Sequence, residues 1–245
     1  MIDRKYLSAA LACIAMQAAA PASAEDSECC FRLTPYYWAV GTDGSLEAKG
    51  PGGTSEVDFG SDIGDVADNL EFNGSLQLEH NSGHWSNFAS VDYLKVDNDD
   101  SDIAGVDVEL ETDATLATVA TGYRFSTGEK SWVDLMIGAR FAKIDMEAEV
   151  AGTEVNGDGD VTDGIVMLRP RIALGKHWAF SPTMAVGAGD SDLVYELAPE
   201  FVYTNDCCNL EFRFGYRRIG YEYDEGGAEL DFTFAGPMAG VGFAF

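Results

Sequence analysis

The three histidines, His80, His84 and His177, are the side chains best suited to acid–base chemistry, because an imidazole commonly activates a nucleophile or a water molecule. Each histidine lies in or beside a short segment typical of a turn, "NSGH" or "GKH", and none has a convincing serine or aspartate partner. Adjacent carboxylates such as Asp99 and Asp100 lie in an acidic segment that shows no pocket. We therefore expect no enzyme active site and no cofactor.

Two acidic segments could bind a metal ion. "DNDDSD" (97–102) and "NGDGDVTD" (156–163) contain clustered oxygen ligands of the kind that Ca²⁺ prefers. Their spacing is only loosely that of a calcium loop, and the glutamate expected at the twelfth position is missing. We therefore expect solvated acidic loops, with a weak divalent-cation site as the alternative.

The N-terminal sequence resembles an export signal. Arg4 and Lys5 precede an apolar stretch and the small-residue site "APASA", which predicts a signal peptide over 1–24 and a mature domain over 25–245. The net charge of −27 argues against nucleic acid as a partner, while 46% hydrophobic and 11% aromatic residues predict an ordered chain. The mature sequence has no apolar run long enough for a transmembrane helix.

Apolar and polar residues alternate along most of the mature chain, which is the pattern of β-strands with two different faces. In "VDLMIGARF", for example, Val133, Leu135 and Ile137 share one face, and Asp134 and Arg140 lie on the other. The expected strands are 31–47, 69–80, 85–97, 106–126, 130–149, 163–177, 178–189, 192–204, 208–224 and 227–245.

Either a soluble β-sandwich or a transmembrane barrel could have this pattern. The barrel is favoured by the strand lengths and by connections that alternate between short turns and longer acidic segments. Aromatic residues near strand ends also suggest an interfacial girdle: Tyr36, Tyr37, Trp38, Trp85, Trp132, Trp178 and Tyr203. We predict an all-β fold, a closed antiparallel transmembrane β-barrel of about ten strands, with eight or twelve as alternatives.

The C-terminus supports this prediction. Val241, Phe243 and Phe245 share one face, and the chain ends on an aromatic residue. Together with "PYYW" (35–38), "GYR" (215–217) and "GPMAG" (236–240), this strand resembles those of small OmpA-like and OmpW-like outer-membrane barrels of Gram-negative bacteria. The resemblance implies an outer-membrane protein that contacts the bilayer and lipopolysaccharide, and whose last strand the outer-membrane assembly machinery recognises. Unlike OmpA, the sequence predicts no domain after the barrel.

Charged residues on the polar faces should line the interior. If the strands around "NDCC" form a hairpin, Glu200 could face Arg213, Glu196 could face Arg217, and Val202 could face Glu211. Across "STGEK", Arg124 could meet Asp134, because opposite charges on facing residues stabilise paired strands. The other expected interior charges are Glu71, Glu79, Asp92, Arg140, Arg169 and Arg171.

Four cysteines form two vicinal pairs, Cys29–Cys30 and Cys207–Cys208. Both pairs fall at the predicted periplasmic end: one just before the first strand, the other in the turn before the ninth strand, which is two steps from the first around the ring. An oxidising periplasm permits disulfides. We expect the pairs to cross-link and clamp the closing seam, with undecided connectivity. Metal binding by the four thiolates is the alternative.

The interior charges allow two functions. A salt-bridged interior would close the barrel and leave a structural or surface-interaction role, which we favour because side chains can largely fill a small barrel. A charged constriction would instead make a narrow, porin-like passive channel for small or apolar solutes, as the OmpW-like resemblance implies. An outer-membrane enzyme is a remote third alternative.

Overall fold

The computed structural model describes residues 31–50, 53–60, 73–103, 106–150, 153–205, 210–225 and 228–245. The expected leader, Glu71 and the four cysteines of the two pairs lie outside these described residues. Among the described residues, no helix is long and apolar enough to cross a membrane.

The described part of the chain consists mainly of β-strands. They are β1 (Phe31–Trp38), β2 (Gly41–Gly50), β3 (Gly53–Gly60), β4 (Gly74–Ser82), β5 (Trp85–Ile103), β6 (Val106–Gly128), β7 (Ser131–Val150), β8 (Thr153–Ala173), β9 (Trp178–Phe180), β10 (Thr183–Gly189), β11 (Leu193–Ala198), β12 (Glu200–Asn205), β13 (Leu210–Glu225) and β14 (Ala228–Ala244).

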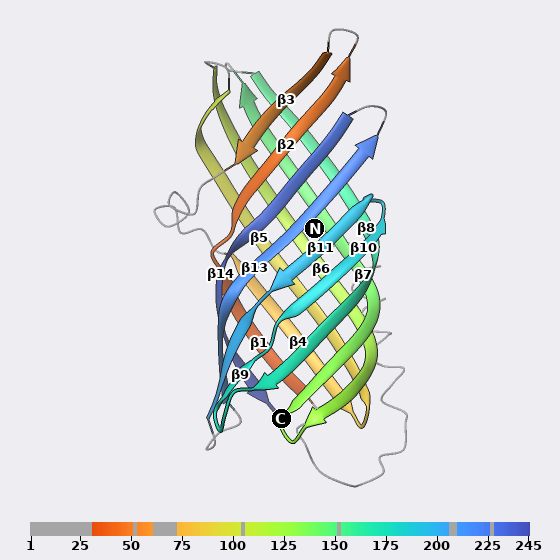
Figure 1. Cartoon of the computed structure of the whole chain (residues 1–245). Helices are drawn as coiled ribbons and strands as arrows, with labels where there is room; N and C mark the ends of the chain where they lie inside the picture. The colour runs from red at the N-terminus through yellow and green to blue at the C-terminus, as the bar shows by residue number, and fades with distance from the viewer. Residues whose placement is uncertain are drawn as a thin grey trace.

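These segments build one closed antiparallel barrel with ten strand positions, which confirms the predicted fold class (Figure 1). Four positions are each occupied by two consecutive segments: β1 with β2, β3 with β4, β9 with β10, and β11 with β12. The barrel closes because β14 pairs with β13 on one side and with β1 and β2 on the other. Closure gives β14 a partner on both of its edges, as a lipid environment requires of the strands that cross it.

The two ends of the described chain meet at this closure. Phe31 and Phe245 each donate a backbone hydrogen bond to the other, at 3.0 and 2.9 Å, and their rings stack. Phe243 and Phe245 point away from the barrel and are 48% and 66% exposed. The aromatic C-terminus therefore completes the outer, apolar surface.

The two faces of the wall differ in the way that a transmembrane barrel requires. On β7, Leu135 and Ile137 point outward and are 47% and 66% exposed, whereas Asp134 and Met136 point inward and are 2% and 0% exposed. From Val133 to Phe141 the outward side chains of β7 are all apolar, a length that matches the ~9–11 residues a tilted strand needs to cross a bilayer. We call this outward-facing apolar zone the belt.

The expected aromatic girdle is only partly correct. Trp85 and Trp178 lie exposed next to the turns at the end of the barrel that carries the C-terminus. Tyr36 and Trp38 instead point into the barrel, where they are 5% and 1% exposed, and Trp132 lies inside beside an arginine. Neighbours on a strand face opposite sides, so a run such as "PYYW" must divide between the belt and the interior.

The acidic segments predicted as loops are strand residues, so that prediction is wrong. Residues 97–102 belong to β5, which has an irregular register between Asn98 and Ser101, and residues 156–163 belong to β8. Strands β5 to β8 pair with one another well beyond the belt. The neighbouring strands satisfy the backbone hydrogen bonds there, so no apolar face is needed to hold these segments extended.

Four prolines lie in one row around part of the wall. The register on either side places Pro170 of β8 opposite Pro182, which in turn lies opposite Pro199. The row continues through Tyr216, which donates a 3.2 Å backbone hydrogen bond to Pro199 and pairs with Pro237. Proline has no N–H to donate, so the ladder is weakened along this row, and the strand segments are interrupted at Pro182 and Pro199.

Candidate functional site

The interior of the barrel contains a balanced set of charges. Seven arginines and seven carboxylates of the described residues point inward. They are Arg32, Arg124, Arg140, Arg169, Arg171, Arg213 and Arg217, with Glu79, Asp92, Asp134, Asp163, Glu196, Glu200 and Glu211. The interior charges of the described residues therefore balance, whereas the whole chain has a net charge of −27.

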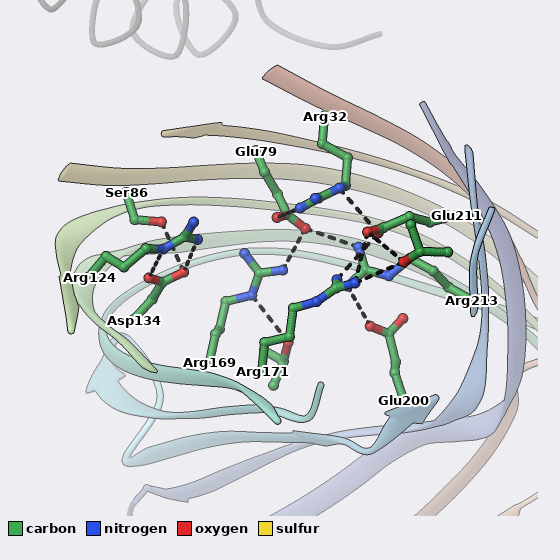
Figure 2. Close-up of polar contacts among 12 residues, drawn as sticks. Arg32, Glu79, Ser86, Arg124, Asp134, Arg169, Arg171, Glu200, Glu211 and Arg213 are labelled. Atoms are coloured by element: carbon green, nitrogen blue, oxygen red, sulfur yellow. Dashed lines mark hydrogen bonds and ion pairs between the residues drawn. The ribbon is translucent and has the colours of Figure 1, made fainter. Parts of the chain in front are cut away.

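Glu79 of β4 is the centre of the larger cluster, which Figure 2 shows. Its carboxylate accepts hydrogen bonds from Arg32 at 2.9 Å, from Arg169 at 2.8 Å and from Arg213 at 3.0 Å. These arginines come from β1, β8 and β13, so Glu79 joins strands from different sides of the barrel. Charge-assisted contacts of this kind are among the stronger hydrogen bonds in proteins.

Two more carboxylates extend this cluster (Figure 2). Glu211 accepts a 2.9 Å hydrogen bond from Arg171 and lies 3.2 Å from Nε of Arg32. Glu200 lies 2.9 Å from Arg213, on the side away from Glu79. Arg32 and Arg213 therefore each bridge two acidic groups.

A separate pair lies across the β6–β7 hairpin. Arg124 donates from Nε and Nη2 to the two oxygens of Asp134, at 2.7 Å each, and Ser86 donates to the same carboxylate at 3.1 Å. The two residues occupy directly opposed positions, as predicted from the turn sequence. A two-point guanidinium–carboxylate contact fixes both side chains.

A second cluster lies farther along β13. Arg217 donates to Asp92 at 2.7 Å and to Glu196 at 2.8 Å. Arg140 of β7 donates to Glu196 from the other side and to the hydroxyl of Thr118 at 3.2 Å. Glu196 therefore lies between two arginines, and the cluster connects β5, β7, β11 and β13.

Aromatic rings cover the guanidinium groups inside the barrel. Arg217 lies 4.8 Å from the ring of Trp38, Arg169 lies 4.4 Å from Phe88, and Arg124 lies 4.4 Å from Trp132. Arginine stacks well on aromatic faces because its planar guanidinium is weakly hydrated. The rings therefore fill space between the charged groups.

An apolar layer lies next to the second cluster, toward the ends of the long strands. Leu94, Ile144, Val194 and Ile219 point inward there and are at most 6% exposed. Tyr221 and Phe232 stack beside them with ring centroids 5.0 Å apart. Ion pairs and apolar packing together occupy successive levels of the interior.

The predicted register around "NDCC" is wrong by two residues. Arg213 lies opposite Val202 rather than Glu200, and Glu211 lies opposite Thr204 rather than Val202. A shift of two residues leaves every side chain on the same face, so the alternating pattern cannot detect it. The ion pairs still form because arginine reaches diagonally to the next inward residue, as it does from Arg217 to Glu196.

Two interior charges were missed by the sequence argument. Arg32 alternates with Thr34 and Tyr36 on β1, and Asp163 has the same parity as Arg169 on β8, so parity could have placed both inside. Asp163 is fully buried and accepts a 3.0 Å hydrogen bond from the backbone N–H of Ser191. Among the described residues, it is the one interior carboxylate without an arginine within ion-pair distance.

The three histidines lie at the end of the barrel that carries the C-terminus. His84 stacks on Tyr123, and His177 lies beside Tyr203. His80 stacks on Phe31, and a 3.2 Å hydrogen bond joins its Nδ1 to Nδ2 of Asn87. The described residues contain no group of three or more histidine, cysteine, aspartate or glutamate side chains arranged to hold a metal ion.

A solved outer-membrane barrel shares this fold. The chain matches the outer-membrane protease OmpT from Escherichia coli with a TM-score of 0.54 and 10% identity, over 91% of this chain and 99% of that one. It also matches OprG from Pseudomonas aeruginosa with a TM-score of 0.41 and 11% identity, over 89% and 97% of the two chains. Ail from Yersinia pestis matches with a TM-score of 0.38 and 9% identity, over 88% and 99%.

The fold is thus that of the bacterial outer-membrane β-barrels. No family model and no curated protein matches the sequence.

Proposed function

We propose that this protein is an integral outer-membrane barrel with a structural or surface-interaction role and an interior closed by its own side chains. The observation that carries this proposal is that each of the seven inward arginines contacts a carboxylate, and that the seven inward carboxylates balance their charge. An ion-selective pore would instead need charges that remain available to the solute.

The outward face supports the membrane location. Large apolar side chains such as Val186, Leu197 and Phe214 are about half exposed, as they would be when they face lipid. A soluble barrel would bury its apolar face and hydrate its charged face, whereas this chain turns seven of its eight described arginines inward and exposes large aliphatic residues.

The long strands support a surface role. On β7 the belt ends at Phe141, and the strand continues through Lys143 to Val150. The partner strand β8 begins at Thr153, so its first residues also lie beyond the belt. The hairpins would thus project beyond the bilayer and present an acidic surface to lipopolysaccharide, to other ligands or to divalent cations. We infer no enzymatic activity, since the histidines lie at the opposite end.

The closing strand would carry the signal for assembly. Phe245 is exposed on the same face as Phe243, where the outer-membrane assembly machinery could bind it before closure. The cysteine pairs would then reinforce the seam: Phe31 and Leu210, next to the two pairs in sequence, both flank β14. A disulfide map of the mature protein by mass spectrometry tests this clamp, which fails if no peptide links the two pairs.

The experiment that tests the proposed function combines membrane insertion with solute permeation. Refolded protein should show heat-modifiable mobility on a gel, and proteoliposomes that contain it should not swell in neutral or apolar solutes. Swelling above that of empty liposomes would favour the narrow passive channel. A complete lack of heat-modifiable mobility in detergent and lipid would contradict the membrane barrel itself.

A further inference from the structure

Arg218 differs from every other arginine that the structure describes. Seven of the eight described arginines point inward and contact a carboxylate, whereas Arg218 on β13 points outward and is exposed. Its contact is with the ring of Tyr195 on β11, whose centroid lies 6.0 Å from the guanidinium carbon. No carboxylate of the described residues lies within ion-pair distance of Arg218.

The position of Arg218 coincides with the upper limit of the belt. Phe212, Phe214 and Tyr216 are the exposed outward side chains that precede it along β13, and Arg218 is the first charged residue after them. The next outward carboxylate on this strand is Glu222, separated from Arg218 by Gly220. A long cationic side chain at this level extends toward the lipid headgroups while its stem remains in the apolar zone.

The surroundings of Arg218 are shaped to hold an aromatic ring beside it. Tyr195 lies opposite Gly220, and its ring lies directly over that glycine, so that a Cβ at position 220 would collide with it. Tyrosine is favoured at membrane interfaces because its ring is apolar and its hydroxyl is polar. Gly220 therefore lets Tyr195 cross to β13 and place its ring beside the guanidinium of Arg218.

We propose that Arg218 and Tyr195 bind a phosphate group of an outer-leaflet lipid, the lipid A part of lipopolysaccharide. The guanidinium offers paired N–H donors that match the oxygens of a phosphate, and the tyrosine hydroxyl adds a further donor. Leu197, directly opposite Arg218, and the belt below would contact the acyl chains of the same lipid. This inference rests on the proposed outer-membrane location.

Lys143 provides a matched control on another part of the rim. It is also an outward cation just above the belt, but it already donates to Asp145. That hydrogen bond is the main cause of a raised pKa for the Lys143 ammonium group, and the nearby Asp160 and Asp158 add to the effect. We therefore expect Lys143 to contribute little to phosphate binding.

The experiment is a titration of the full mature protein, folded in detergent, with bisphosphorylated lipid A and with dephosphorylated lipid A, followed by native mass spectrometry. Heat-modifiable mobility confirms the fold of every variant before binding is measured. We expect R218Q to weaken binding of bisphosphorylated lipid A about tenfold, the effect of losing one charge-assisted contact. R218K should lose less, K143Q should match the wild type, and Gly220→Ala, which displaces Tyr195, should weaken binding with Arg218 intact.

Two outcomes would overturn the site. In one, R218Q binds bisphosphorylated lipid A as the wild type does; in the other, K143Q loses as much as R218Q. Millimolar inorganic phosphate should not displace the lipid, and full displacement would mean that Arg218 takes free phosphate instead. Failure of the barrel proposal would be visible separately, as a missing heat shift in the wild type.

Discussion

The substitution Arg213→Ala tests whether the interior network holds the barrel together. Arg213 is 2% exposed, lies 2.9 Å from Glu200 and donates at 3.0 Å to Glu79. Without it, Glu79 keeps two arginines, but Glu200 has no cationic partner among the described residues. Removing one member of a buried ion pair leaves an uncompensated charge, which costs about 3–5 kcal/mol.

The double variant R213A/E200A separates this effect from lost packing. Removing both charges eliminates the uncompensated carboxylate, so we expect it to recover about 2 kcal/mol of the loss, within the range typical of coupled neighbours. The assay is urea-induced unfolding in lipid vesicles, followed by tryptophan fluorescence and by heat-modifiable mobility. Lys143→Ala, at an exposed lysine outside the proposed lipid site, serves as the control and should leave the free energy of unfolding almost unchanged. The reasoning is refuted if R213A is no more destabilising than K143A, or if the double variant is as unstable as the single one.

Three further predictions use the same unfolding assay. P170V/P182V should stabilise the barrel by about 1–2 kcal/mol, because two N–H donors return to the row of prolines in the hydrogen-bond ladder. An unchanged midpoint of urea unfolding would show that the prolines do not weaken this row. Asp163→Asn should be neutral or stabilising, because it removes an unpaired buried charge and keeps an oxygen for the bound N–H. Asp92→Asn should instead cost about 2 kcal/mol, because it weakens an ion pair. Equal changes in stability for the two variants would contradict this difference. Gly240→Ala should destabilise the barrel by about 1–3 kcal/mol, since a Cβ there would lie only 2.8 Å from a backbone oxygen of β1. A variant as stable as the wild type would show that the two strands move apart easily at this point.

Strand parity could be predicted from the sequence because it depends on local alternation. Asp134 and Arg140 were assigned to the interior from "VDLMIGARF", and both are buried there. The pairing of Arg124 with Asp134 could also be predicted, because a short turn fixes the register of its hairpin.

Other features depend on contacts that alternation does not encode. The register of β12 on β13 was missed by two residues because such a shift preserves both faces. Glu79 could not be identified as the centre of a cluster, since its arginine partners come from strands far apart in the sequence. The acidic hairpins were predicted as loops because strands outside the bilayer need no apolar face.

The most direct test of the closed interior is single-channel conductance of the refolded wild-type protein in planar bilayers. The account predicts a heat-modifiable barrel that gives no steady conductance, because Arg213 and Arg217 remain bound to carboxylates inside it. A steady conductance that Arg217→Ala or Arg213→Ala alters would contradict the closed interior and show that these arginines line an open channel.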